Sequence, residues 1–295
     1  MDKLVEIKNI SYWVNDASSL GNRKKILNEI TFDIFEGEIL SIVGESGAGK
    51  STLAKIIAGI ISAPSGQIIT KIKLRGKQNP ETIQLLFQND EDLINPQRKV
   101  KDIIADGTED NNNFIEVLSE VGVRSELLDQ FGYNVSGGER QRIGLARLLV
   151  TNPKLLILDE PFSAQDIISK AVFKDLLVQL NMHNKLTLII ITHEINLLEN
   201  FVNRIAVMYD GRILEIADCH EFFTHPRHPY SRFLINSSNY KLERKDILQT
   251  DVNTPVICNY YSRCERRRDE CTKHLDLIKT QYSIVYCNFP YDKDS

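Results

Sequence analysis

The stretch "ILSIVGESGAGKST", residues 39 to 52, decides the fold of this 295-residue chain. Residues 39–43 are an apolar, partly β-branched run that predicts a buried strand ending at Gly44. The loop that follows fits the pattern G-x-x-x-x-G-K-[ST], whose small residues let backbone N–H groups surround phosphate oxygens at a helix N-terminus. From Lys50 to about Gly59, apolar residues recur at helical spacing. The sequence therefore predicts a strand, a phosphate-binding loop and a helix in succession.

This phosphate loop (residues 44–52) gives its residues separate expected roles. Lys50 is expected to reach the β- and γ-phosphates, and the Ser51 hydroxyl is expected to hold Mg²⁺. A glycine-rich turn without a ligand is the alternative, and the flanking strand and helix argue against it. The residues expected to contact the nucleotide are Gly44, Glu45, Ser46, Gly47, Ala48, Gly49, Lys50, Ser51 and Thr52.

Further apolar runs predict an α/β fold with a mostly parallel sheet. Strands are expected at the apolar runs 82–87, 154–159 and 186–192. These strands are expected to be parallel, because the segments between the runs are long enough for crossover helices. Residues 205–216 place Asp210-Gly211 between two short apolar runs, which predicts a hairpin closing the core.

Polar residues follow the predicted strands at the edge where ligands bind in open parallel sheets. Asp159 and Glu160 end the buried run "LLILDEP", where an unpaired acid favours a nearby cation. We expect Asp159 to bind Mg²⁺ and Glu160 to orient and deprotonate the attacking water. Gln88 is expected to ligate Mg²⁺ or the water, and His193 to contact the γ-phosphate. Taken singly, Gln88 and His193 are more often ordinary loop residues, and their place beside the acids favours function.

A second loop with anion-binding character occurs at "VSGGERQR", residues 135–142, called here the signature loop. Ser136 and Glu139 have the spacing of a capping box, which satisfies backbone donors at a helix start. That interpretation leaves Gly137 and Gly138 unexplained, because two glycines weaken a helix start unless a ligand must approach the backbone closely. A phosphate is a candidate for that ligand.

In order and spacing, these motifs resemble the ATP-binding-cassette ATPases over residues 1 to 235. The resemblance implies a Walker A at "GESGAGKS", a Q-loop at Gln88, a Walker B at "LLILDEP", a D-loop at residues 163–166 and a switch histidine at His193. ATP and Mg²⁺ are the implied cofactors. The fold class is then an α/β P-loop NTPase core with an antiparallel β subdomain, an inserted helical subdomain at about 89–150 and a cysteine-containing extension.

The same resemblance implies that the signature loop faces away from its own Walker A and completes the site of a second subunit. Ser136, Gly137 and Gly138 would then contact the partner's γ-phosphate. An aromatic residue near the start is expected to stack on adenine, with Trp13 as the candidate and Tyr12 as the alternative. The sequence departs from the family at two positions: Glu139 replaces the usual signature Gln, and Gln165 replaces the usual D-loop Leu.

A boundary is expected near residue 235, where the composition becomes polar, basic and cysteine-bearing, so that residues 236–295 form a C-terminal extension. The stretches "FQNDEDLINPQRKV" (87–100) and "HPRHPYSRFL" (225–234) resemble the peptide and nickel importer branch. Two prolines beside His225 and His228 favour a rigid turn over a metal site.

Four cysteines of the extension are separated by five, six and fifteen residues, unlike the C-x₂-C spacing of ordinary zinc sites. From the residues alone, free thiols are favoured. The branch resemblance instead implies a [4Fe-4S] cluster with four thiolate ligands, with zinc as the rival metal. The implied ligands are Cys258, Cys264, Cys271 and Cys287.

The charge and the apolar runs of the sequence limit which partners and locations are expected. The net charge of −4 gives no electrostatic support for binding nucleic acid, and the apolar runs are far shorter than the roughly 20 residues of a membrane span. The start of the chain lacks the apolar run of a signal peptide, so a reducing compartment is expected.

The resemblance therefore implies an ATP-hydrolysing subunit of an importer for peptides or nickel-type complexes, bound peripherally to the cytoplasmic face of the membrane. Its implied partners are a second cassette subunit, two transmembrane permease subunits and, indirectly, an extracytoplasmic substrate-binding protein. The alternative is a soluble, non-transport cassette ATPase of DNA repair or translation. Such proteins usually carry a long coiled coil, a zinc insertion or two cassettes, and the sequence shows none of these.

Overall fold

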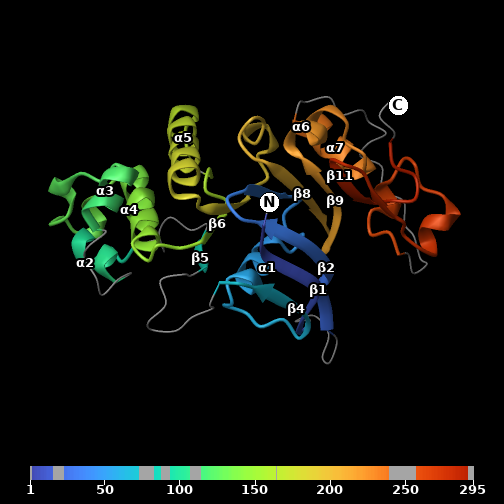
Figure 1. Cartoon of the computed structure of the whole chain (residues 1–295), viewed down its shortest axis with the longest axis horizontal. Coiled ribbons are helices and arrows are strands. Elements are labelled where there is room, and N and C mark those ends of the chain that lie inside the picture. The colour runs from blue at the N-terminus through green and yellow to red at the C-terminus, as the bar shows by residue number, and fades with distance from the viewer. Residues whose placement is uncertain are drawn as a thin grey trace.

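The computed structural model describes residues 2–15, 23–72, 83–87, 94–106, 114–163, 165–238 and 257–291. Within these residues an eight-stranded sheet forms the centre of the molecule (Figure 1). Its strands are β3 (Ile39–Val43), β5 (Ile83–Leu86), β6 (Leu155–Asp159), β7 (Thr187–Ile191), β8 (Arg204–Tyr209), β9 (Arg212–Asp218), β10 (Leu277–Lys279) and β11 (Ser283–Tyr286).

The strand order β10-β11-β9-β8-β3-β7-β6-β5 places β3 in the middle of the sheet. Strands β5, β6, β7, β3 and β8 are parallel to one another. Every residue of β3, β6 and β7 is buried, as expected for parallel strands covered on both faces. Their carboxyl ends therefore meet at one edge, and the expected mostly parallel α/β sheet is confirmed.

The predicted hairpin is also confirmed, since β8 and β9 are antiparallel and Asp210 and Gly211 between them have positive φ values of 41° and 77°. The expectation that this hairpin closes the core is wrong. Strand β11 pairs antiparallel with β9, and β10 pairs with β11, so the C-terminal extension adds two strands to the same sheet. Strand pairing between distant segments leaves no local pattern in the sequence.

A smaller antiparallel sheet has the order β2-β1-β4, with β1 at Lys3–Asn15, β2 at Arg23–Phe35 and β4 at Ser65–Thr70. Helix α1 (Lys50–Ile57) buries Leu53, Ala54, Ile56 and Ile57 in the apolar cluster shared by this sheet and one face of the large sheet. Figure 1 shows α1 beside β1, β2 and β4. The expected antiparallel β subdomain is thus present.

Helices form the described part of the segment expected to be a helical subdomain. They are α2 (Val100–Ala105), α3 (Phe114–Val121), the 3₁₀ turns η2 (Ser125–Leu127) and η3 (Gly132–Asn134), and α4 (Gly137–Leu149). Together with α5 (Ile167–Asn184), which follows β6, they lie to one side of the small sheet in Figure 1. Among the helices described, none has the length and apolarity needed to cross a membrane.

The chain after β9 forms α6 (Cys219–Thr224), α7 (Pro229–Ser238) and the 3₁₀ turns η6 (Tyr261–Arg263) and η7 (Asp269–Thr272). Helix α7 continues past residue 235, where the boundary is expected. Cys258, Tyr260 and Cys271 of the extension are buried in the same apolar cluster as the large sheet. The division at residue 235 stays a prediction.

A close approach between backbones fixes the phosphate loop against β8. A Cβ added at Gly44, whose φ is 152°, would lie 2.0 Å from the carbonyl oxygen of Met208. At Gly49, whose φ is 97°, it would lie 2.8 Å from a methyl group of Leu27. Glycine is required at both positions because a side chain would push the loop off the strand.

Candidate nucleotide site

A pocket of ≈690 Å³ lies at the edge where the parallel strands end. The phosphate loop forms one side, and residues following β6 and β7 form the other. From the expected site it gathers Ser46, Gly47, Gly49, Lys50, Ser51, Thr52, Asp159, Glu160 and His193. Residues more than a hundred positions apart in the chain thus face one cavity, and their individual roles stay predictions.

Lys50 lies buried at the start of α1 and is bonded to its own loop. Its Nζ donates to the carbonyl oxygens of Gly44 at 2.8 Å and Glu45 at 2.9 Å. Burial lowers the pKa of Lys50, and the charges of Glu160, Asp159 and Glu45 oppose that shift. The ammonium group is therefore held by two carbonyl acceptors, which phosphate oxygens would replace if Lys50 bound a nucleotide.

Asp159 ends β6 inside the pocket and carries the features of a cation ligand. Burial raises the pKa of its carboxyl group, a shift that the hydrogen bond with Ser51 opposes. Its Oδ1 has no hydrogen-bond partner among the described residues. Hydroxyl and carboxylate oxygens are ligands that Mg²⁺ prefers. Ser51 and Asp159 therefore fit the expected Mg²⁺ site.

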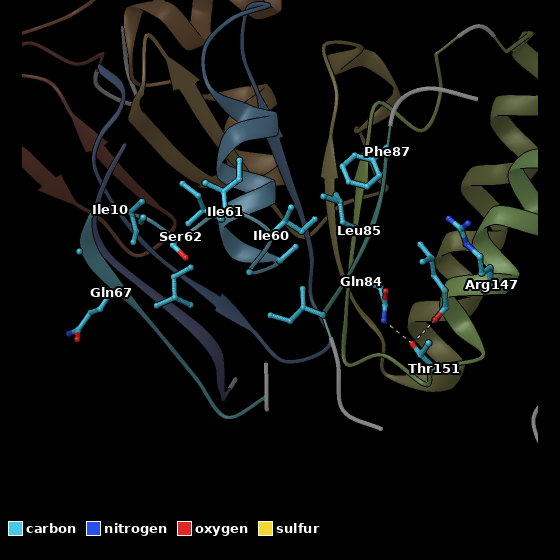
Figure 2. Close-up of a pocket in the computed structure, with 18 of the residues that line it drawn as sticks. Ile10, Ile60, Ile61, Ser62, Gln67, Gln84, Leu85, Phe87, Arg147 and Thr151 are labelled. Atoms are coloured by element: carbon cyan, nitrogen blue, oxygen red, sulfur yellow. Dashed lines mark hydrogen bonds between the residues drawn. The ribbon is translucent and has the colours of Figure 1, made fainter. Parts of the chain in front are cut away.

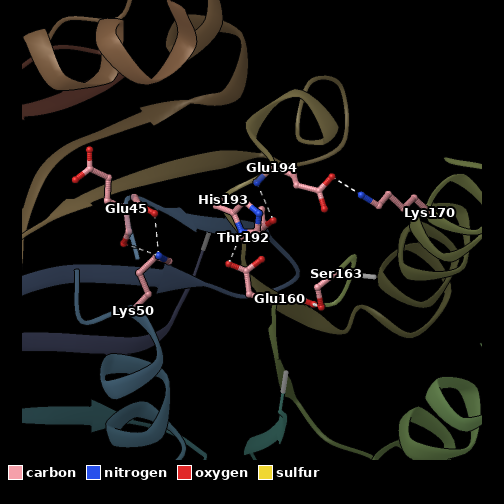
Figure 3. Close-up of polar contacts among 9 residues, drawn as sticks. Glu45, Lys50, Glu160, Ser163, Lys170, Thr192, His193 and Glu194 are labelled. Atoms are coloured by element: carbon pink, nitrogen blue, oxygen red, sulfur yellow. Dashed lines mark hydrogen bonds and ion pairs between the residues drawn. The ribbon is translucent and has the colours of Figure 1, made fainter. Parts of the chain in front are cut away.

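Glu160 directly follows β6 in the left-handed conformation, with φ of 52°. Its N–H donates to the carbonyl oxygen of Ile191 at 2.8 Å, which ties the strained residue to the end of β7. Its Oε1 lies 2.9 Å from Nδ1 of His193, while Oε2 is buried without a partner among the described residues. The carboxylate thus orients His193 with one oxygen and has the other available for a ligand (Figure 3).

The signature loop does not line this pocket. The capping box is confirmed: the Ser136 hydroxyl accepts from the N–H of Glu139, and the Glu139 carboxylate accepts from the N–H of Ser136. Arg124 donates to the same carboxylate at 3.0 Å, which offsets the acid introduced at this position. Gly137 and Gly138 are exposed, and a Cβ on either would meet no atom within 4 Å. The two glycines are thus open to a molecule outside this chain.

One residue of α4 that no sequence motif predicts contacts the turn after Glu160. The buried Gln141 donates from Nε2 to the carbonyl oxygen of Pro161 at 2.6 Å. Gln165 donates to the same oxygen at 3.0 Å and also bonds to Gln141. The unusual Gln165 therefore joins α4 to the turn that follows Glu160.

Two further residues are expected at the nucleotide site: Gln88 and an aromatic residue of β1. Gln88 lies outside the described residues. Trp13 lies in β1 with Lys25 5.3 Å from its ring centre, whereas Tyr12 packs against the apolar cluster around α1. This favours Trp13 as the ring left for stacking, which stays a prediction.

The four cysteines of the extension line one small cavity together with His228. Burial raises the pKa of the Cys264 thiol and of the Cys287 thiol to about 12 each, so both are protonated at neutral pH. No group of three or more His, Cys, Asp or Glu side chains in the described ranges has the geometry of a metal site. The side chains as placed therefore do not form the ligand set of the implied iron–sulfur cluster, although all four cysteines line one cavity.

A second pocket, of ≈750 Å³, lies between the small sheet and α4 (Figure 2). Ile60 and Ile61 border it on one side, and Leu85 and Phe87 border it on the other. Gln84 donates to the Thr151 hydroxyl at 3.2 Å across its floor. It contains neither the phosphate loop nor the acids that follow β6, so it is distinct from the nucleotide pocket.

Comparisons with known proteins agree with this geometry. The family "ABC transporter" matches residues 27–163, and the family "Oligopeptide/dipeptide transporter, C-terminal region" matches residues 214–271. The oligopeptide transport ATP-binding protein OppF of Streptococcus mutans is 35% identical over 252 residues, covering 80% of this chain and 81% of the relative. The probable D,D-dipeptide transport ATP-binding protein DdpF of Escherichia coli is 37% identical, covering 83% of each.

A solved structure shows the same fold. The chain resembles cbiO1 of Clostridium perfringens, described as part of the ABC transporter complex cbiONQ, with a TM-score of 0.66 and 25% identity. The likeness covers 82% of this chain and 96% of that protein.

Asp159 should make the ligand-free protein less stable as pH rises. Its folded pKa is raised, so above the ordinary value of 3.8 the folded state holds a proton that the unfolded chain has lost, and unfolding free energy falls until pH passes the folded pKa. Asp159→Asn should remove this part of the pH dependence, as measured by urea unfolding without Mg²⁺. Asp129→Asn is the control, because its salt-bridged carboxyl has a lowered pKa and an opposite slope. Equal slopes for Asp159→Asn and the unmodified protein would contradict the assignment.

Proposed function

This chain belongs to the ATP-binding-cassette transporter family, and from that premise we propose that it is the ATP-hydrolysing subunit of a peptide importer. The observation that carries ATP hydrolysis is the single pocket shared by the phosphate loop, Asp159, Glu160 and His193. A non-transport role in DNA repair or translation has no support from the relatives found.

The pocket assigns a task to each group of residues. Ser51 and Asp159 would hold Mg²⁺, which neutralises charge on the phosphates. Lys50 would exchange its two carbonyl acceptors for phosphate oxygens. Glu160 would hold the attacking water through the carboxylate oxygen that His193 leaves free, and accept its proton. The Glu160 to His193 contact would keep the carboxylate aimed into the pocket.

The peptide branch is supported by the match of residues 214–271 to a peptide-transporter region and by the names of the relatives. These names do not extend to nickel, so a nickel-type cargo stays a prediction with less support. We place the subunit at the cytoplasmic face of the membrane, bound to two permease subunits and indirectly served by an extracytoplasmic substrate-binding protein.

A second cassette is the partner that the site itself requires. Ser136, Gly137 and Gly138 lie outside the chain's own pocket, yet Gly137 and Gly138 leave backbone exposed at the start of a 13-residue helix. A helix N-terminus favours an anion. We propose that it receives the γ-phosphate of an ATP bound to the partner cassette, whether identical or paralogous.

Glu160→Gln should abolish turnover while ATP binding persists, because the amide keeps the side-chain shape but cannot accept the water proton. The expected loss in kcat is about 10²- to 10⁴-fold. ATPase assays on the assembled membrane complex, with ATP binding measured in parallel, check it. Glu194→Gln is a nearby control, since Glu194 pairs with Lys170 outside the pocket. Undiminished hydrolysis by Glu160→Gln would remove its assigned role.

The cysteine region carries a separate proposal. We propose a [4Fe-4S] cluster, or zinc, held by Cys258, Cys264, Cys271 and Cys287, supported by the branch resemblance and by the one cavity that all four line. Binding would require the thiols to lose their protons and move together.

Anaerobic purification followed by iron, sulfide and zinc analysis should then find about four iron and four sulfide per chain, or one zinc. Cys219→Ser is the control, because this buried thiol instead contacts the carbonyl oxygen of Leu198 and should leave the metal content unchanged. A chain without iron, sulfide or zinc would leave only free thiols.

A further inference from the structure

Two groups from the C-terminal part of the chain hold Glu45, the second residue of the phosphate loop. The Arg263 guanidinium donates to both oxygens of the Glu45 carboxylate, at 2.7 and 3.0 Å. The Tyr230 hydroxyl accepts the N–H of Glu45 at 2.9 Å. The side chain and the backbone of one loop residue are therefore both fixed by residues about 185 to 218 positions later.

Contacts other than the one with Glu45 also hold the Arg263 side chain in place. Its side chain is only 14% exposed, and its guanidinium carbon lies 4.9 Å from the ring centre of Phe233 and 5.8 Å from that of Tyr260. Arginine stacked in this way loses little further freedom when one of its terminal nitrogens pairs with a carboxylate. The Arg263–Glu45 ion pair is thus held by the packing of Arg263, unlike a mobile ion pair on the surface.

A third link reaches the other half of the loop. Asn259 of the extension donates to the carbonyl oxygen of Asp210 at 2.7 Å and to its carboxylate at 2.9 Å. The neighbouring Gly211 donates from its N–H to the carbonyl oxygen of Ala48 at 3.0 Å. The extension therefore supports the hairpin tip against which the phosphate loop rests.

The negative charge of Glu45 is the reason that its ion pair with Arg263 should affect ATP binding. A carboxylate on a phosphate loop repels a triphosphate unless a cation compensates it. In Figure 3 the Glu45 carboxylate points away from Lys50, although the main-chain oxygen of Glu45 accepts a bond from that lysine. When Lys50 turns to the phosphates, its bond to the Glu45 carbonyl oxygen is lost. Arg263 still holds the Glu45 carboxylate, and Tyr230 and the N–H of Ala48, which donates to the carbonyl oxygen at 3.2 Å, still hold its backbone.

We propose that Arg263 is a positioning residue for ATP binding, which makes the C-terminal extension a working part of the nucleotide site. It neutralises Glu45 and keeps the carboxylate directed away from the bound phosphates. This inference rests on the proposed function as an ATPase. It assigns to the extension an effect on ATP affinity, separate from the hydrolytic step at Glu160.

The test is a double-mutant cycle in the full chain within the assembled complex. Arg263→Met keeps the stacking volume but leaves Glu45 uncompensated, so KM for ATP should rise about fivefold with kcat nearly unchanged. Adding Glu45→Gln removes the repelling charge and should restore most of the affinity. Arg263→Lys should have a smaller effect, because it retains the charge.

Arg268→Met is the matched control, because Arg268 stacks 4.2 Å from the ring centre of Phe289 in the same extension, and its KM should equal that of the unmodified protein. An unchanged KM for Arg263→Met would overturn the proposal. So would a raised KM that Glu45→Gln fails to restore, since that result indicates a purely structural role. If the unmodified complex neither binds nor hydrolyses ATP, the proposed function fails instead.

Discussion

The burial of two adjacent carboxylates at the end of β6 is the constraint on which the rest of the site depends. Asp159 and Glu160 each have a buried oxygen with no partner in the described part of the chain. Taking such groups out of water is costly unless a cation, a proton or a hydrogen-bond donor compensates them. Lys50, Ser51 and His193 supply part of this compensation, and Mg²⁺ with a nucleotide and its attacking water would supply the remainder.

The same geometry separates the signature loop from the chain's own nucleotide pocket. Its own pocket contains the groups that hold a nucleotide and the carboxylate that activates water, while the signature loop lies elsewhere. Gln141 joins α4 to the turn after Glu160 through the carbonyl oxygen of Pro161. If Ser136 contacts a partner's nucleotide, a displacement of α4 would therefore also move the turn that carries Asp159 and Glu160. In the proposed dimer, this link would give closure a physical route to Asp159 and Glu160.

Local sequence patterns were sufficient for the parts of the fold that are locally determined. The strand at 39–43, the loop after it and the helix from Lys50 follow from apolar spacing and glycine placement, and the structure has them at these positions. Contacts between distant segments could not be predicted in this way. The pairing of β11 with β9 is one example, because pairing depends on which strand edge the folded chain leaves open.

The nucleotide site also combines residues that local sequence patterns predict with contacts between distant segments that they do not. Asp159 and Glu160 can be predicted as site residues because acids after a buried apolar run are unusual, whereas Gln141 and Arg263 lie in ordinary polar stretches of the sequence. Glu45 was assigned to the nucleotide from its place in the loop, yet its carboxylate is bonded to Arg263 and does not line the pocket. Chemical type alone gives no indication of which of several arginines meets a given acid.

The structure of the assembled complex, trapped with Mg²⁺ and ATP by Glu160→Gln, tests the central claim most directly. This account predicts that each triphosphate lies between the phosphate loop of one cassette and the signature loop of the other. Ser136, Gly137 and Gly138 of this chain would then lie within hydrogen-bond distance of a γ-phosphate held by the partner. A trapped complex in which these three residues face solvent, far from any triphosphate, would contradict it.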